Sequence, residues 1–191
     1  MKLPVLNLNV RNFQKFTPAF LAAILVLLGC LNFFQTLSFP FVHDDLVFIR
    51  NNPDISRLDN WREIFARVPE PQGIVNFYHR PGLELLYRIQ YMFFKFDAGA
   101  YHGFNVVLHI LNGLLLFYVL MRILSGYEES LGRACHRADG QAGPLRFLFI
   151  PPSLWLAWSV AVIFVIHPVQ TESVACVSGV SNLLPVFLCL L

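Results

Sequence analysis

Two adjacent carboxylates, Asp44 and Asp45, are the residues in this sequence best suited to chemistry. They follow an uncharged run, Pro18 to Leu37, that is long enough to cross a bilayer. Adjacent carboxylates repel each other, so one of them binds a proton more strongly unless a cation lies between them; this suits a general base or a ligand of a divalent metal. Solvation in a loop or capping of a helix is the alternative, and the acid pair alone leaves both roles open.

A second group of polar residues lies in the segment Asn76 to Leu86, which reads NFYHRPGLELL. Arg80 stands at the entry to a predicted helix, where its forked guanidinium group could bind a phosphate. An arginine at a membrane boundary can instead anchor the chain to lipid headgroups. Tyr78 has the corresponding alternatives, a place in the interfacial aromatic belt or a contact with a ligand.

Two further polar sets flank apolar segments. Asn105, His109 and Asn112 are spaced four and three residues apart, so they share one face of a predicted helix. Hydrogen bonding between helices is the role this spacing favours, and a direct part in catalysis is the alternative. The sequence HPVQTE places His167 and Glu172 around a predicted helix start, where Glu172 either complements the helix dipole or supplies another carboxylate to a site.

The composition indicates what kind of protein positions these residues. Hydrophobic residues make up 56% of the chain and charged residues only 14%, whereas a soluble domain carries about a quarter charged residues. We therefore predict an all-α polytopic membrane protein. The net charge of +2, without any run of Lys or Arg, gives no indication of nucleic acid as a partner.

The hydrophobic pattern predicts one transmembrane module over residues 1–191 with about four membrane-spanning helices. The expected spans are residues 18–37, 101–121, 147–166 and 174–191. An outer loop, 40–100, is expected to hold two helices that rest on the membrane surface, 60–68 and 83–97, and a cytoplasmic loop is expected at 122–146. In the second surface helix Glu84 and Arg88 are four residues apart, which is the spacing of an ion pair.

Charge around the first span sets the expected orientation. Lys2, Arg11 and Lys15 precede it and the acid pair follows, so we expect a cytoplasmic N-terminus and an acid pair on the outer face. Because the sequence stops at Leu191 inside an apolar run, we expect the N-terminal part of a larger, here truncated, protein. The sequence has no N-x-S/T sequon, and a bacterial inner membrane is expected rather than an ER membrane.

Taken in order, the motifs HDD…NNPD, Y-x-R-P, Y-H-G-F-N-x-x-L-H-x-L-N and HPVQTESVAxxSG resemble those of the transmembrane-and-tetratricopeptide-repeat proteins. These are polytopic glycosyltransferases of the GT-C superfamily, related to the protein O-mannosyltransferases. The resemblance covers roughly residues 20 to 185. It favours a functional role for the acid pair over a capping role.

The resemblance implies transfer of a sugar, mannose or another hexose, from a polyprenyl- or dolichyl-phosphate donor to a hydroxyl of a protein or glycan acceptor on the outer face. It implies a divalent metal, Mg²⁺ or Mn²⁺, as an optional cofactor held by Asp44 and Asp45, and no other cofactor. The implied catalytic residues are Asp44, Asp45 and Glu172, and the implied substrate-binding residues are Tyr78, Arg80, His102 and His167.

The sequence departs from the family pattern at two positions. Where that pattern has an Arg and an acid, in SGR-x-D-LL, this chain has Val180 and Asn182. An inactive membrane scaffold or lipid-binding relative is therefore an alternative. A transporter, with Asp44, His109 and Glu172 along its path, is a weaker one, since the acids fall at helix ends. If the protein is a transferase, these 191 residues are expected to form only part of it.

Overall fold

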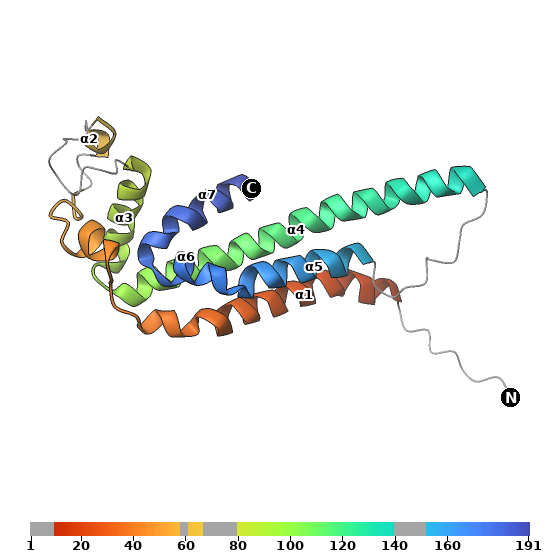
Figure 1. Cartoon of the computed structure of the whole chain (residues 1–191), viewed down its shortest axis with the longest axis horizontal. Coiled ribbons are helices and arrows are strands. Elements are labelled where there is room, and N and C mark those ends of the chain that lie inside the picture. Colours follow the sequence, from red (N-terminus) through yellow and green to blue (C-terminus); the bar gives the residue numbers. More distant parts are fainter. Residues whose placement is uncertain (1–9, 58–60, 67–79, 140–151) are drawn as a thin grey trace.

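The computed structural model describes residues 10–57, 61–66, 80–139 and 152–191, and within these ranges the secondary structure is helical, without strands (Figure 1). The longer helices are α1 (Val10–Phe33), α2 (Trp61–Ala66), α3 (Pro81–Phe94), α4 (Ala98–Asp139), α5 (Pro152–Ile166), α6 (Thr171–Ala175) and α7 (Val180–Leu190). Single turns complete them: η1 (Phe34–Ser38), η2 (Leu46–Arg50), η5 (Pro168–Gln170) and η6 (Val177–Gly179).

Helices α1, α4 and α5 lie side by side as a long bundle, and α7 runs along the first part of α4 (Figure 1). Helices α2 and α3 lie at the end of the bundle where α1 finishes and α4 begins (Figure 1). The sequence predicted helices at 60–68 and 83–97, close to the observed α2 and α3. The helical fold class is confirmed for the described residues.

Small residues allow the bundle helices to approach closely. A Cβ atom on Gly113 of α4 would lie 2.4 Å from the Val165 side chain of α5, and one on Gly29 of α1 would lie 2.6 Å from Ile110 of α4. Ala157 of α5 is fully buried in the same contact region. Small residues at such crossings let backbones pack together where water does not drive association, as in membrane helices.

The four membrane spans expected from the sequence are not confirmed. Two helical segments, Thr17–Ser38 and Ala98–Ser130, are long and apolar enough to cross a bilayer, and α5 with α6 makes a third if a 47° bend between them is accepted within one span. The expected fourth span contains α7, whose 11 residues rise about 16 Å against a hydrocarbon thickness of about 30 Å. Helix α4 also continues to Asp139, into the range 122–146 where a loop was predicted.

A cluster of buried hydrophobic residues forms the end of the bundle that carries the acid pair. It brings together the end of α1, the loop before α2, helix α3, the start of α4 and the segment from α6 to α7. Its buried members include Phe33, Ile49, Tyr87, Val174 and Val177. This cluster therefore positions segments that are far apart in the sequence around one site.

Candidate functional site

Asp45 is almost completely buried, with 1% of its surface exposed, and its carboxylate accepts three backbone N–H groups. Oδ2 lies 3.4 Å from the nitrogen of Val42 and 3.3 Å from that of Val177, and Oδ1 lies 2.8 Å from the nitrogen of Ser178. Val177 and Ser178 belong to η6, the turn that leads into α7. Asp45 therefore joins the first loop to the α6–α7 turn.

Asp44 has the opposite environment, because its side chain is exposed. The two acids are presented by a turn in which His43 has a φ of 47°, a left-handed conformation that non-glycine residues adopt only occasionally. The turn is closed by hydrogen bonds from the Asp45 nitrogen to the Val42 oxygen at 3.0 Å and from the Leu46 nitrogen to the His43 oxygen at 3.2 Å. Of the pair, Asp44 is the carboxylate that solvent can reach.

The HPVQTE corner lies at the same end of the molecule as the acid pair, since η6 follows it directly and contacts Asp45. The His167 ring caps η5: its Nδ1 accepts the backbone N–H of Val169 at 3.1 Å. Glu172 is exposed in the first turn of α6, where a negative charge complements the helix dipole. The corner thus adds one more exposed carboxylate at this end of the molecule.

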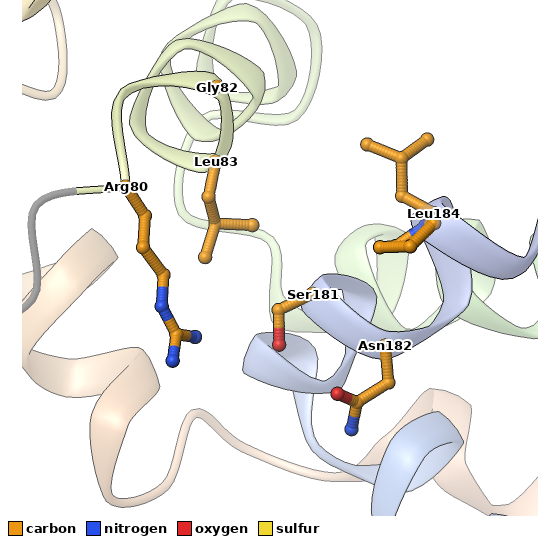
Figure 2. Close-up of a pocket in the computed structure, with 7 residues that line it drawn as sticks. Arg80, Gly82, Leu83, Ser181, Asn182 and Leu184 are labelled. Atoms are coloured by element: carbon orange, nitrogen blue, oxygen red, sulfur yellow. The ribbon is translucent and has the colours of Figure 1, made fainter. Parts of the chain in front are cut away.

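A pocket of about 330 Å³ opens between the starts of α3 and α7 (Figure 2). Its lining consists of Arg80, Gly82, Leu83, Ser181, Asn182, Leu184 and Pro185. Arg80 extends from α3 toward α7, and the Ser181 hydroxyl lies on the facing side (Figure 2). The lining combines one cation and two polar side chains with an apolar wall and contains no acid. Such a pocket suits an anionic group attached to an apolar chain.

The polar side chains along one face of α4 form hydrogen bonds with backbone carbonyl oxygens in the segment from α5 to α7. Asn105, His109 and Asn112 are all 0% exposed. The bonds join Asn105 Nδ2 to the carbonyl oxygens of Cys176 (2.8 Å) and Val177 (3.2 Å), His109 Nε2 to that of Val165 (3.1 Å), and Asn112 Nδ2 to that of Leu183 (3.0 Å). The helix–helix hydrogen bonding predicted for these residues is confirmed.

Two buried polar side chains near Asp45 have no hydrogen-bond partner among the described residues. The Tyr87 hydroxyl is one, and its pKa is raised by burial and further by the negative charge of Asp45. His102 is the other: it is 0% exposed, its ring packs edge-on to Phe39, and neither ring nitrogen has a partner at hydrogen-bond distance, although backbone of Phe39 and Pro40 lies nearby. Tyr78, predicted to bind substrate, lies outside the described residues.

The divalent metal that the resemblance implied for the acid pair stays a prediction. No group of three or more His, Cys, Asp or Glu side chains able to hold a metal occurs within the described ranges. Both oxygens of Asp45 are already bonded to backbone N–H groups, so Asp44 is the one carboxylate of the pair open to a ligand. We therefore assign no step of a reaction to a metal.

Comparison with curated proteins finds relatives of this chain in animals. It is 30% identical to mouse protein O-mannosyl-transferase TMTC1 over 179 residues, 91% of this chain and 16% of the relative. The chain is related to protein O-mannosyl-transferases. The human protein of the same name is 26% identical over 184 residues, and a protein O-mannosyl-transferase of Caenorhabditis elegans is 26% identical over 165 residues.

The chain spans 16% and 17% of the length of its mouse and human relatives and 20% of that of the relative from Caenorhabditis elegans. No protein-family model matches this chain. The search of solved structures found no match to it. Because the relatives come from a mouse, a human and a nematode, the expected bacterial inner membrane is not supported. The apolar helices support association with a membrane.

Sequence reasoning missed two features of this site. The first is the partner of Asp45, which lies 132 residues away in sequence. The second is Gly179: a Cβ atom there would lie 2.2 Å from the carbonyl oxygen of Ser173, so only glycine allows α6 and α7 to fold back this tightly. The SG pair in HPVQTESVAxxSG was the available signal for that turn.

Proposed function

We propose that this chain forms the donor-binding part of a membrane mannosyltransferase. The enzyme takes mannose, or another hexose, from a polyprenyl- or dolichyl-phosphate donor and transfers it to a hydroxyl of a protein or glycan on the outer face of the membrane. The N-terminus then lies in the cytoplasm, and the acid pair and the α3–α7 pocket lie on the outer side. The supporting observation is the pocket itself, which lies with exposed Asp44 at one end of an apolar bundle.

In the proposed reaction Asp44 acts as the general base. It accepts the proton of the acceptor hydroxyl while that oxygen forms a bond to the anomeric carbon of the sugar. The bond from the anomeric carbon to the phosphate oxygen breaks, and its electron pair leaves with the lipid phosphate. Arg80 offsets the charge that grows on the phosphate. A carboxylate and an arginine therefore suffice for the step as written.

The composition of the pocket supports a lipid-linked donor. Arg80, Ser181 and Asn182 offer donors to phosphate oxygens, while Leu83 and Leu184 offer an apolar wall to the start of an isoprenoid chain. An arginine guanidinium makes charge-assisted hydrogen bonds to phosphate, about twice as strong as neutral ones. Both halves of such a donor thus find complementary groups in one pocket.

Helix α3 supports a placement at the headgroup plane. Its outer side exposes large apolar side chains, with Phe93 77% and Met92 53% exposed. Two cations stand beside aromatic rings at this end: Arg50 lies 4.9 Å from the Phe96 ring centre, and Lys95 Nζ lies 5.2 Å from that of Tyr91. A helix with exposed apolar and cationic groups fits the boundary between lipid and water. We propose that α3 rests there and sets the depth of the pocket.

The acceptor is proposed to approach over the HPVQTE corner. Glu172 is exposed there, and His167 uses Nδ1 to cap η5, which leaves Nε2 to carry the ring proton or donate a bond to an acceptor. These two residues and Asp44 are the side chains we assign to the acceptor side. His102 is fully buried, and we assign it a supporting place beneath the loop.

The proposal is tested with the full-length protein in membranes of cells that lack their own copy. Radiolabelled mannose is followed from dolichyl-phosphate mannose into protein for the wild type, Asp44→Asn and Arg80→Ala. General-base catalysis contributes about 10²–10⁴-fold, so Asp44→Asn should lose transfer by at least about a hundredfold. Asp54→Asn, an equal change of charge elsewhere in the loop, should transfer at close to the wild-type rate.

Full transfer by Asp44→Asn would rule out the proposed base. Absence of transfer by the wild type, combined with binding of dolichyl phosphate that depends on Arg80, would favour the lipid-binding alternative. The departures at Val180 and Asn182 make that alternative worth distinguishing. Abundance in the membrane is measured for each variant, so that loss of protein is not taken for loss of activity.

A further inference from the structure

The two adjacent acids differ more in their surroundings than a shared catalytic role would require. Asp44 is exposed, whereas Asp45 is 1% exposed and its carboxylate oxygens accept three backbone N–H groups. An ionised carboxylate has about four lone-pair sites. With three N–H donors directed at it and no access from solvent, Asp45 has little capacity left to take a proton from a substrate hydroxyl.

The donors on Asp45 come from two distant segments. The Val42 nitrogen lies in its own turn, and the nitrogens of Val177 and Ser178 lie in η6. On the other side of the same peptide groups, Asn105 of α4 donates to the carbonyl oxygens of Cys176 and Val177. The segment from Cys176 to Ser178 is therefore held through its N–H groups by the first loop and through its carbonyl groups by α4.

We call this arrangement, in which Asp45 and Asn105 hold residues 176–178, the clamp. The clamp lies between the groups that the proposed reaction needs. Asp45 directly follows Asp44, and η6 leads within a few residues to Ser181 and Asn182 of the pocket. We propose that Asp45 is a positioning residue, which fixes the exposed carboxylate of Asp44 relative to the α3–α7 pocket by holding η6. The statement that Asp45 holds η6 rests on the hydrogen bonds alone. The statement that this contact matters for catalysis rests on the proposed function.

Cys176 reports on the clamp independently of sugar transfer. Its thiol is partly buried next to the held N–H groups, and its pKa is raised by burial and then by Asp45, Glu172 and Asp44 in that order. Loss of the Asp45 carboxylate should both loosen η6 and remove a charge that suppresses the thiolate. Because the thiolate is the reactive form, both changes should speed reaction with a maleimide.

The experiment uses the full-length protein in its membrane, with Cys176 as the only cysteine. The rate of labelling by a maleimide is compared for the wild type, Asp45→Ala, Asp45→Asn and Asp44→Asn. We expect labelling about tenfold faster in Asp45→Ala and a smaller increase in Asp45→Asn, which keeps one acceptor oxygen. Asp44→Asn should stay within about twofold of the wild type, because Asp44 raises the pKa of the Cys176 thiol less than Asp45 and Glu172 do.

Sugar transfer then separates positioning from base catalysis. A positioning role predicts partial activity in Asp45→Asn, where the amide oxygen still accepts one N–H, and near-complete loss in Asp44→Asn. Equal loss in both variants, with unchanged labelling of Cys176, would overturn the inference and make Asp45 a second reacting group. Faster labelling of Asp45→Ala in a protein without any transfer activity would retain the clamp and reject the proposed function.

A cross-link serves if the Asp45 variants fail to accumulate. The nitrogens of Val42 and Ser178 both bond to the Asp45 carboxylate, and Ser178 is partly exposed, so cysteines at these two positions should react together with a short bifunctional thiol reagent. The pair Val42→Cys and Val186→Cys, with the second site exposed at the far part of α7, should not. Absence of the first cross-link in the folded protein would overturn the clamp.

Discussion

The side-chain nitrogen of Asn105 lies 2.8 Å from the carbonyl oxygen of Cys176, 71 residues further along the chain. Cys176 stands where α6 ends and the backbone is extended before η6. A backbone carbonyl outside a helix needs a partner when water is excluded, and an amide on a neighbouring helix supplies it. Asn105 of α4 thus satisfies backbone carbonyl groups that are not bonded within a helix and allows a non-helical segment to be buried in the bundle.

Asn105→Ala should lower the stability of the protein. Two carbonyl oxygens lose a donor, and hydrogen bonds between membrane helices contribute about 0.6–2 kcal/mol. We expect a loss of about 1–2 kcal/mol, visible as a lower unfolding temperature in detergent. Val107→Ala is the control, since Val107 lies two residues further on the same helix and is 57% exposed. Equal unfolding temperatures for the two variants would contradict the bracing role.

Gly179→Ala should prevent correct packing of α7 on α6. The added Cβ would lie 2.2 Å from the Ser173 carbonyl oxygen, a backbone atom that cannot rotate away. We expect a cost of about 3 kcal/mol or more and a sharp fall in abundance in the membrane. At Gly126 an added Cβ meets nothing within 4 Å, so Gly126→Ala should be neutral or stabilising by up to about 1 kcal/mol. A stable Gly179→Ala protein would contradict this α6–α7 arrangement.

Glu84→Gln should destabilise the protein through Arg88. The Arg88 side chain is 1% exposed, and its guanidinium lies 2.5 Å from Glu84 Oε1. Removing one partner of a buried ion pair leaves an uncompensated charge and costs about 3–5 kcal/mol. Partial exposure of Glu84, at 25%, places the expected loss at the lower end, about 3 kcal/mol.

The double variant Glu84→Gln with Arg88→Met is the informative comparison. Replacing a buried charge by an apolar side chain of similar length removes the penalty, so most of the stability should return. Chemical denaturation of the purified protein in detergent measures both. If the double variant is the sum of two large losses, the cost comes from packing and the bond from Arg88 to the Arg57 carbonyl oxygen, rather than from charge.

Asn182→Asp should weaken binding of a lipid phosphate, because this chain has Val180 where the family pattern pairs such an acid with an Arg. The pocket lining contains one cation, Arg80, and no acid. A carboxylate facing a phosphate costs several kcal/mol by like-charge repulsion, so the affinity should fall by about a hundredfold or more. Binding of radiolabelled dolichyl phosphate to the purified protein measures it. Asn51→Asp adds the same charge at an exposed position outside the lining and should bind as the wild type does. Unchanged affinity in Asn182→Asp would place the phosphate elsewhere.

Local patterns in the sequence predicted the local contacts well. The spacing of Glu84 and Arg88 predicted an ion pair, which is confirmed; its Arg88 side chain is buried, whereas Glu84 is partly exposed. The polar stripe on α4 predicted hydrogen bonds between helices because a lipid-facing position for three polar residues is too costly. Helical periodicity is sufficient to predict such contacts, because the two partners of the ion pair lie on one helix and the three polar residues share one face of another.

The number of spans and the role of Asp45 depend on contacts that no local pattern contains. The hydrophobic pattern predicted spans at 147–166 and 174–191, but the second of these stretches is divided among the end of α6, η6 and α7. Asp45 looked like a partner for Asp44, whereas two of its three N–H donors lie in η6. Those donors lie more than a hundred residues away in the sequence. Only the tertiary fold brings them to Asp45, and nothing in the sequence around the acid pair indicates this contact.

Helix α4 has a mechanical consequence outside the lipid. Its 42 residues rise about 63 Å, twice the hydrocarbon thickness of about 30 Å. No ordinary tilt could immerse it from end to end, so about half of its length extends beyond the hydrocarbon layer as part of one continuous helix. Spin labels placed at intervals along α4 should therefore cross from an oxygen-rich to a water-rich environment partway along a single unbroken helix.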